Sequence, residues 1–188
     1  MVGRSNVGKS TLINALVRRK IARTSAAPGK TRLANFYRVT PDGPPPFYLV
    51  DLPGYGYARG GESSAREFEA LTGAYFGSRE GTDPVLAGVM LLVDSRHPGL
   101  DADRRAWNWL QHRHVPCQVI ATKVDKLTRS ERVRHLNDLE RLHEGPVQAV
   151  SAQTGEGLKE LWKTIDALLR QSPRGTPPRP PPNRSPSI

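Results

Sequence analysis

The sequence predicts an α/β fold in which a mostly parallel, doubly wound sheet is flanked by helices. Two observations support this prediction. Apolar runs typical of buried strands alternate with segments of helical periodicity along the 188 residues, and this alternation favours a parallel sheet with helices on both faces. The stretch GRSNVGKS, residues 3–10, directly precedes a helical pattern, which is where a glycine-rich loop joins a strand to a helix in such folds.

The elements follow one another in a regular order. A polar stretch, residues 23–32, separates the first helix from two strands that form a hairpin around the turn PDGPPP, because proline continues neither a helix nor a ladder. Later apolar runs read as buried parallel strands. Strands are expected at residues 33–40, 47–50, 85–93, 117–121 and 146–150, and helices after the glycine-rich stretch and at 65–76, 102–112, 129–143 and 158–171.

The last two helices carry the clearest signals. Thr128 and Glu131 have the spacing of a capping box at the start of the helix at 129–143. Apolar residues at helical spacing indicate the buried side of each helix. These residues are Leu12, Ile13, Leu16 and Val17 in the first helix, Val133, Leu136, Leu139 and Leu142 in the fourth, and Leu158, Leu161, Ile165, Leu168 and Leu169 in the last.

Length and composition indicate one folded domain, residues 1–171, followed by a disordered tail, residues 172–188, rich in Pro, Arg and Ser. The tail is either an electrostatic tether or an inert extension. No apolar run approaches the roughly 18 residues that span a bilayer, and the start lacks the pattern of a signal peptide. We therefore expect a cytoplasmic protein without a membrane span, acting as a monomer. The single cysteine, Cys117, excludes an internal disulfide and a cysteine cluster for zinc.

The charge balance is strongly basic. The formal net charge is +10 and the sequence pI is about 10.3. An excess of this size favours a polyanionic partner such as RNA or an anionic surface, although basic proteins without such a partner also exist.

The stretch at residues 3–10 matches the phosphate-binding pattern G-x-x-x-x-G-K-[ST]. In such a loop the backbone N–H groups surround the phosphates, Lys9 adds a positive charge, and the Ser10 hydroxyl can ligate Mg²⁺. The positive end of the following helix faces the same anion. By itself the match also fits an ordinary loop before a helix, so the downstream motifs decide its meaning.

A second motif follows the strand at 47–50. Asp51 ends the apolar run and opens the sequence DLPG, which ends at Gly54. At this position a carboxylate can hold Mg²⁺ through water, and a glycine N–H can reach a γ-phosphate. Thr31, in the polar stretch after the first helix, is the remaining candidate for a magnesium ligand.

Two further strand ends suggest that the base is guanine. The sequence TKVD, Thr122 to Asp125, closes an apolar strand, where ligand-binding residues of an open parallel sheet lie. A carboxylate there accepts hydrogen bonds from the N1–H and the exocyclic amine of guanine, and adenine has no such donor pair. Ser151 and Ala152 end the next strand and could contact the guanine carbonyl oxygen through their backbone. A solvated turn is the alternative interpretation of TKVD alone, but the order of the four motifs favours a nucleotide site.

These motifs resemble one family of small bacterial GTPases, the EngB (YihA/YsxC) GTP-binding proteins. The resemblance rests on GRSNVGKS, ARTSAAPGKTRLANFY, TKVDKL, VSAQTGEG and above all DLPGYGYA, and it covers roughly residues 2–169. It implies the P-loop GTPase fold, a Ras-like G domain. It also implies a slow hydrolysis of GTP to GDP and a switch in assembly of the large ribosomal subunit, with rRNA or that subunit as partner and a link to cell division and septation.

The resemblance also implies a set of site residues. Lys9, Thr31 and Gly54 would act in catalysis, and Ser10 and Thr31 would hold Mg²⁺. Asn6 resembles an asparagine that binds K⁺ near the phosphates in related GTPases, although it could equally brace the loop. The implied nucleotide contacts are Gly3, Arg4, Ser5, Asn6, Val7, Gly8, Lys9, Ser10, Gly29, Lys30, Thr31, Arg32, Leu33, Asp51, Leu52, Pro53, Gly54, Thr122, Lys123, Val124, Asp125, Val150, Ser151 and Ala152.

The sequence departs from the family pattern in two places. Ala26 and Ala27 stand where hydroxyl residues are usual, which we expect to alter loop mobility more than chemistry. Family members also have a complete strand before the phosphate loop, whereas only Met1 and Val2 precede Gly3 here. We interpret Met1 as an internal residue of a longer protein whose start was assigned too late, with a truncated gene product as the alternative. Loss of this central strand would remove several kcal/mol of apolar burial.

The residue after DLPG is Tyr55, where other GTPases have a glutamine that orients the attacking water. We therefore expect weak intrinsic hydrolysis that a partner or K⁺ stimulates. Two other functions remain open. One is a nucleotide-independent RNA-binding or ribosome-binding remnant of such a GTPase. The other is a related GTPase of tRNA modification or ribosome maturation, which the single-domain layout argues against.

Overall fold

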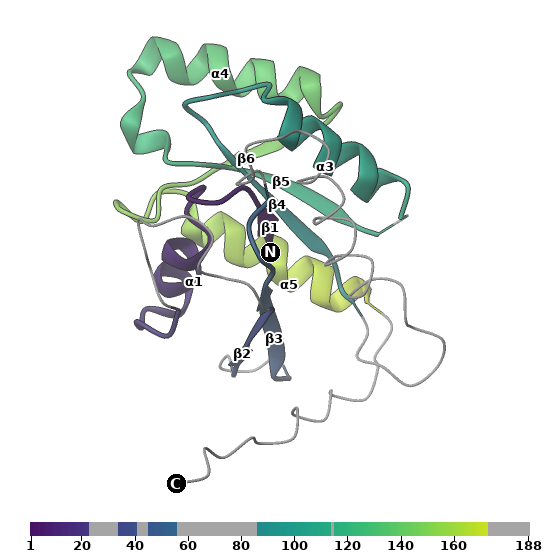
Figure 1. The fold of residues 1–188 in the computed structure, drawn as a ribbon. Helices are drawn as coiled ribbons and strands as arrows, with labels where there is room; N and C mark the ends of the chain where they lie inside the picture. The colour runs from purple at the N-terminus through teal and green to yellow at the C-terminus, as the bar shows by residue number, and fades with distance from the viewer. Residues whose placement is uncertain (23–33, 41–44, 56–85, 114, 173–188) are drawn as a thin grey trace, which may run out of the picture.

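A computed structural model describes residues 1–22, 34–40, 45–55, 86–113 and 115–172. Four parallel strands form one sheet in the order β1-β4-β5-β6, and β2 and β3 form an antiparallel hairpin (Figure 1). The α/β prediction is therefore confirmed. The strands are β1 (Val2–Gly3), β2 (Asn35–Val39), β3 (Phe47–Asp51), β4 (Val89–Asp94), β5 (Cys117–Thr122) and β6 (Val147–Ala149). The helices are α1 (Lys9–Val17), α3 (Asp101–Gln111), α4 (Arg129–Leu142) and α5 (Leu158–Gln171), with a 3-10 turn, η1, at Val124–Lys126.

Strand β4 lies at the centre of the four-stranded sheet. All six of its residues are buried, since β1 and β5 pair with it in parallel on its two edges and helices cover both faces. Its side chains alternate between two cores. Met90 and Leu92 point to the side of α1 and α5, whereas Leu91 and Val93 point to the side of α3 and α4. This explains why the run reads as continuously apolar in the sequence.

Strand β1 has only two residues, as the sequence indicates, yet the chain around it is bonded on two sides. Val2 and Gly3 pair with β4. On the other side, Met1 donates its amine to the Val50 carbonyl and accepts from the Leu52 N–H. A parallel bridge between Arg4 and Tyr55 continues this contact. These backbone bonds attach the β2–β3 hairpin to the four-stranded sheet.

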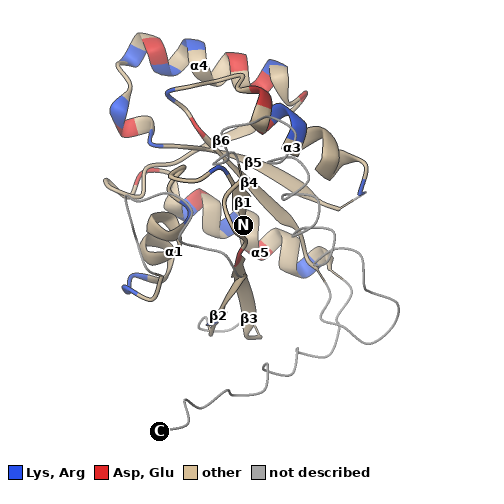
Figure 2. Cartoon of the chain, in the orientation of Figure 1, with Lys and Arg blue, Asp and Glu red and all other residues tan. Residues whose placement is uncertain are grey.

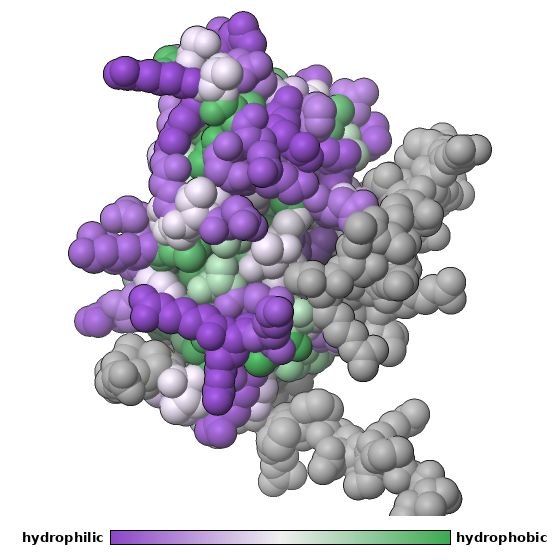
Figure 3. Space-filling model, turned by 90° about the vertical axis from the view of Figure 1, so that its left-hand side faces the viewer, coloured by the Kyte–Doolittle hydropathy of each residue, from purple (hydrophilic) through white to green (hydrophobic). Residues whose placement is uncertain are grey.

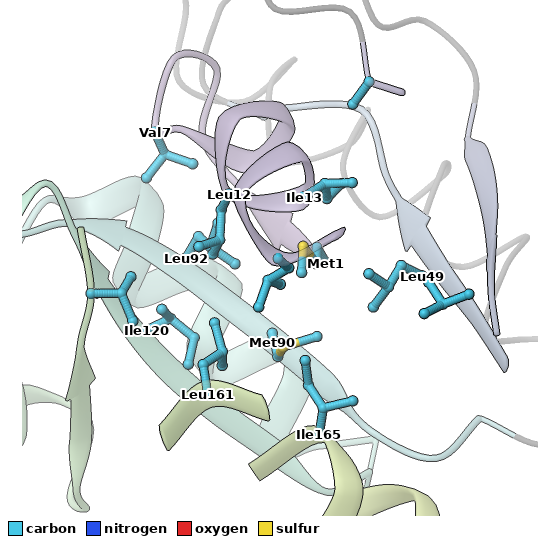
Figure 4. Close-up of a cluster of buried hydrophobic side chains, with 14 residues drawn as sticks. Met1, Val7, Leu12, Ile13, Leu49, Met90, Leu92, Ile120, Leu161 and Ile165 are labelled. Carbon is cyan, nitrogen blue, oxygen red and sulfur yellow. The ribbon is translucent and has the colours of Figure 1, made fainter. Parts of the chain in front are cut away.

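Two apolar cores, one on each face of the sheet, fix the helices. Figure 4 shows the first core, in which Leu12 and Ile13 of α1 and Leu161 and Ile165 of α5 gather against β4 and β5. The second core packs α3 and α4 against the opposite face. On the side of the molecule seen in Figure 3, hydrophilic side chains cover most of the described surface, with small apolar areas between them.

The predicted boundaries differ from the observed ones at a few points. The strand expected to begin at residue 85 begins at Val89. Gly88, directly before it, lies against Leu168 of α5, where an added Cβ would be 3.0 Å from that side chain. The buried side of α4 is narrower than predicted: Val133 is 59% exposed, whereas Leu139 is buried. The capping box of Thr128 and Glu131 is confirmed. The helix predicted at 65–76, the polar stretch at 23–32 and the tail at 173–188 lie outside the described residues.

Candidate functional site

The predicted motifs meet where the strands end at their carboxyl edge. The loop at residues 3–10 follows β1, and the DLPG segment follows β3. Thr122 to Asp125 follow β5, while Val150 to Ala152 follow β6. The crevice at this edge is the usual ligand site of an open α/β sheet. Four of the five predicted segments therefore converge, and the fifth, Gly29 to Leu33 with Thr31, lies outside the described residues.

The glycine-rich loop wraps around the end of the Lys9 side chain. Its ammonium donates to the carbonyl oxygens of Gly3 at 2.9 Å and Arg4 at 3.2 Å. The turn needs left-handed backbone at Asn6, with φ 62°, and at Gly8, with φ 106°, which favours glycine at the latter. Burial lowers the pKa of Lys9 to about 8, against the influence of Asp51. The loop thus places the Lys9 ammonium beside the start of α1, an arrangement that suits phosphate.

Ser10 and Asp51 form the candidate magnesium pair. The Ser10 hydroxyl donates to Oδ2 of Asp51 at 3.3 Å. Asp51 is 1% exposed, and its Oδ1 is buried with no hydrogen-bond partner among the described residues. Burial raises the pKa of Asp51, and Lys9 opposes this shift. A buried carboxylate oxygen that lacks a donor next to a hydroxyl fits a hard divalent cation, so these residues fit Mg²⁺.

No cluster of three or more His, Cys, Asp or Glu side chains that could hold a metal occurs within the described ranges. Phosphate and water oxygens, which Mg²⁺ usually keeps among its ligands, could complete the coordination of an ion at Ser10.

Gly54 lies in close contact with the phosphate loop. A Cβ at this position would be 2.8 Å from the backbone nitrogen of Ser5, so only glycine fits without a shift. The Ser5 N–H donates to the Tyr55 carbonyl at 3.1 Å, and the Ser5 hydroxyl lies 3.4 Å from the Gly54 carbonyl. The DLPG segment and the loop are therefore held side by side.

Thr122 and Lys123 brace the phosphate loop from β5. The Thr122 hydroxyl lies 2.8 Å from the Val7 carbonyl and 3.0 Å from the Val93 carbonyl, so its proton bonds to one or both. Lys123 has left-handed backbone and donates from its ammonium to the Asn6 carbonyl at 2.6 Å. Both side chains predicted to contact the nucleotide therefore also shape the loop that would hold its phosphates.

Asp125 is oriented by Ser151. The Ser151 hydroxyl donates to Oδ1 of Asp125 at 2.7 Å, and it accepts from the N–H groups of Gln153 at 3.2 Å and Thr154 at 3.1 Å. The hydrogen bond from Ser151 lowers the pKa of Asp125, so the carboxylate is ionised at neutral pH. A fixed, ionised carboxylate of this kind can accept two parallel N–H donors from one edge of a purine.

The sequence analysis missed two aspartates. Asp94 ends β4, accepts from Lys123 at 2.9 Å and forms a two-point ion pair with Arg96. The sequence did contain a signal for Asp94, because this residue follows an apolar run as Asp51 does. Asp103 on α3 is 3% exposed and accepts from the Tyr55 hydroxyl. Nothing in the sequence marked Asp103 as a buried residue, since an aspartate in the first turn of a helix is common on the surface.

Comparisons with known proteins agree with this geometry. The sequence model of the family described as "50S ribosome-binding GTPase" matches residues 1–123. The chain is 41% identical to "Probable GTP-binding protein EngB" of Desulforamulus reducens, over 90% of this chain and 82% of that protein. It is also 41% identical to the protein of the same name from Thermotoga maritima, over 91% of this chain and 86% of that protein.

Solved structures share the fold. A probable GTP-binding protein engB superposes with a TM-score of 0.66 at 24% identity, covering 90% of this chain and 97% of that one. Era in complex with MgGDPNP and nucleotides 1506–1542 of 16S ribosomal RNA superposes with a TM-score of 0.74 at 23% identity, covering 95% of this chain and 57% of the Era chain. Within the described residues no helix is both long and apolar enough to cross a bilayer.

Proposed function

We propose that this chain, which belongs to the EngB family of GTPases, binds GTP with Mg²⁺, hydrolyses it slowly to GDP, and acts in the cytoplasm as a monomeric switch in assembly of the large ribosomal subunit. Binding of a guanine nucleotide is supported above all by the Asp125 carboxylate, which Ser151 holds in place. The phosphate loop beside it is braced by Lys123 and Thr122. A link to cell division and septation rests on the family resemblance alone.

Each group of site residues would bind a different part of the nucleotide or its metal ion. The N–H groups of residues 3–10 and the Lys9 ammonium would bind the phosphates, and Gly54 would offer its N–H to the γ-phosphate. Asp125 would accept from the guanine edge, with the Ser151 and Ala152 backbone on the other side of the base. Ser10 and Thr31 would hold Mg²⁺, with Asp51 acting on it through water. When bound, the ion neutralises charge on the β- and γ-phosphates.

The position of Tyr55 supports the proposal of slow hydrolysis. Tyr55 is 6% exposed, and its hydroxyl donates to the Asp103 carboxylate. Tyr55 therefore cannot orient an attacking water. Stimulation would come from a ribosomal partner or from K⁺ held at Asn6, which is an exposed residue of the loop.

Charge distribution supports a ribosomal RNA partner. On the side of the sheet covered by α1 and α5, the exposed basic residues outnumber the acidic ones (Figure 2). The exposed basic residues of segment 18–20 and of α5 that form no ion pair with another described residue are Arg18, Arg19, Lys20, Lys159 and Lys163. Unpaired exposed cations on one side suit a phosphate backbone.

The nucleotide part is tested by titrating a fluorescent GDP into the protein with Mg²⁺, followed by competition with GTP and with ATP. We expect GTP to compete and ATP to fail. Competition by ATP would refute the assignment of the base. Phosphate release is then measured in Na⁺ and in K⁺, with and without large ribosomal subunits. Rapid turnover in Na⁺ by the protein alone would contradict the slow switch.

The ribosomal part is tested by cosedimentation with large subunits. Charge reversal by Arg19→Glu together with Lys163→Glu should weaken binding and reduce its salt dependence, since each lost phosphate contact lowers the slope by about one. Arg134→Glu, an exposed change on α4, is the matched control and should leave binding unchanged. Binding to rRNA that is the same with GTP, with GDP and without nucleotide would favour the nucleotide-independent remnant.

A further inference from the structure

Three polar side chains from separate parts of the chain meet on the α3 side of the sheet. The Tyr55 hydroxyl donates to Oδ1 of Asp103 at 2.9 Å, and Nε of Arg4 lies 3.4 Å from Oδ2 of the same carboxylate. We call Arg4, Tyr55 and Asp103 the Asp103 cluster. Asp103 and Tyr55 are 3% and 6% exposed. Buried polar groups of this kind are costly unless they are paired, so the hydrogen bond fixes Tyr55 and Asp103, and the ion pair places Arg4 beside them.

The cluster is joined by backbone bonds to both segments that would contact the γ-phosphate. Arg4 is the second residue of the phosphate loop and forms a parallel bridge with Tyr55. Tyr55 directly follows Gly54, and its carbonyl accepts from the Ser5 N–H at 3.1 Å. Gly54 itself lies close to the loop, because a Cβ added there would be 2.8 Å from the Ser5 nitrogen. A shift of the Tyr55 side chain would therefore move the Gly54 peptide relative to the loop.

Helix α3 gives the cluster a fixed support. Ala106 and Leu110, on the turns after Asp103, are buried in the core on this face of the sheet. Burial and the neighbouring Asp103 carboxylate raise the pKa of Tyr55 well above its ordinary value. The phenol consequently keeps its proton and remains a donor over the physiological range. The segment with Gly54 is thus supported by α3, a helix that contains none of the predicted nucleotide contacts.

We propose that Asp103 is a positioning residue for recognition of the γ-phosphate: by holding Tyr55 and Arg4, it sets the Gly54 N–H and the phosphate loop at the separation that a triphosphate needs. This inference rests on the proposed GTP binding and goes beyond it, because Asp103 is not among the predicted nucleotide contacts. A diphosphate has no group to meet Gly54. Asp103 therefore affects the preference for GTP over GDP more than it affects the binding of GDP.

The experiment compares the affinities of Asp103→Asn and Tyr55→Phe for GDP and for a non-hydrolysable GTP analogue. The matched control is Asp101→Asn, because Asp101 lies on the same helix and its side chain is 79% exposed. Loss of one hydrogen bond to a charged phosphate corresponds to about a tenfold loss of affinity. Tyr55→Phe should thus lower the ratio of analogue to GDP affinity about tenfold, with GDP affinity kept within about threefold. Asp103→Asn should lie between Tyr55→Phe and the wild type, since an amide oxygen still accepts from Tyr55.

The outcomes separate this inference from the proposed function. A wild-type protein that binds neither nucleotide overturns the proposed function and the inference with it. Wild-type binding of both, with an unchanged ratio in Tyr55→Phe, overturns only the role of Asp103. Equal loss of GDP and analogue in both variants, accompanied by a lower melting temperature, also overturns it, because that result reflects a purely structural ion pair.

Discussion

Replacing Asp125 by Asn is expected to change the preferred base from guanine to xanthine. The Ser151 hydroxyl accepts from the N–H groups of Gln153 and Thr154 and donates its proton to Oδ1 of residue 125. Ser151 therefore selects the orientation of an asparagine amide, with the carbonyl oxygen toward the hydroxyl and Nδ2 directed away from it. Guanine would then meet an N–H donor where its exocyclic amine needs an acceptor, whereas xanthine has a carbonyl oxygen at this position.

The magnitude follows from the two hydrogen bonds that the carboxylate would accept. Hydrogen bonds to a charged group contribute about 1.5–3 kcal/mol each. Their loss lowers the affinity for GDP about a hundredfold to ten-thousandfold. Xanthosine diphosphate should recover most of that difference in Asp125→Asn and should bind poorly to the wild type.

Competition between fluorescent GDP and each unlabelled diphosphate measures the exchange of specificity. Asp138→Asn, on α4 away from the site, is the control and should keep the guanine preference. If Asp125→Asn keeps GDP affinity, or loses it without gaining xanthosine diphosphate, then the carboxylate does not read the base as argued. Adding Ser151→Ala to Asp125→Asn removes the group that orients the amide, so the gain for xanthine should shrink.

Three further results are expected. Thr122→Val leaves the Val7 carbonyl without its buried donor, so the free energy of unfolding in urea should fall by about 1–3 kcal/mol; an unchanged urea midpoint would show that water replaces the hydroxyl. Burial favours a raised pKa for Asp94, but its hydrogen bonds hold the pKa well below the ordinary value of 3.8. Its contribution to stability is therefore complete above pH 3.8 and is lost as the pH falls through the lower folded pKa. Acid unfolding should become shallower in Asp94→Asn, and parallel acid curves for the two proteins would contradict this sign. Ser10→Ala removes a proposed magnesium ligand, so the gain in GDP affinity on adding Mg²⁺ should fall about tenfold or more; the same gain in both proteins would exclude Ser10 as a ligand.

The sequence predicted the parts of the molecule that depend on local pattern. Strands β3, β4 and β5 are apolar runs whose ends place an aspartate or threonine at one edge, and the capping box at Thr128 depends on neighbours three residues apart. Residues 3–10 of the candidate site were predicted from a local motif, and the other three described segments from their place at the ends of strands.

Contacts between distant residues could not be predicted in this way. Tyr55 and Asp103 are 48 residues apart, and nothing in the helical periodicity of α3 distinguishes a buried aspartate from a solvated one. Val133 shows the opposite error. It lies at helical spacing with buried leucines but is 59% exposed, because the core reaches only the strip of α4 around Leu139. Periodicity predicts which residues share a face, whereas the width of the covered strip depends on tertiary packing.

The contacts between β5 and the phosphate loop suggest why base and phosphate recognition belong to one structural unit. The Thr122 hydroxyl reaches the Val7 carbonyl across 115 residues of sequence, and the Lys123 ammonium reaches the Asn6 carbonyl across 117. Lys123 also pairs with Asp94, which ends the central strand. The segment that carries Asp125 is therefore fixed to the loop that would hold the phosphates, and both are fixed to the most deeply buried strand of the sheet. A displacement of the loop would move the carboxylate that reads the base, so the two ends of a bound nucleotide would stabilise each other through these three side chains.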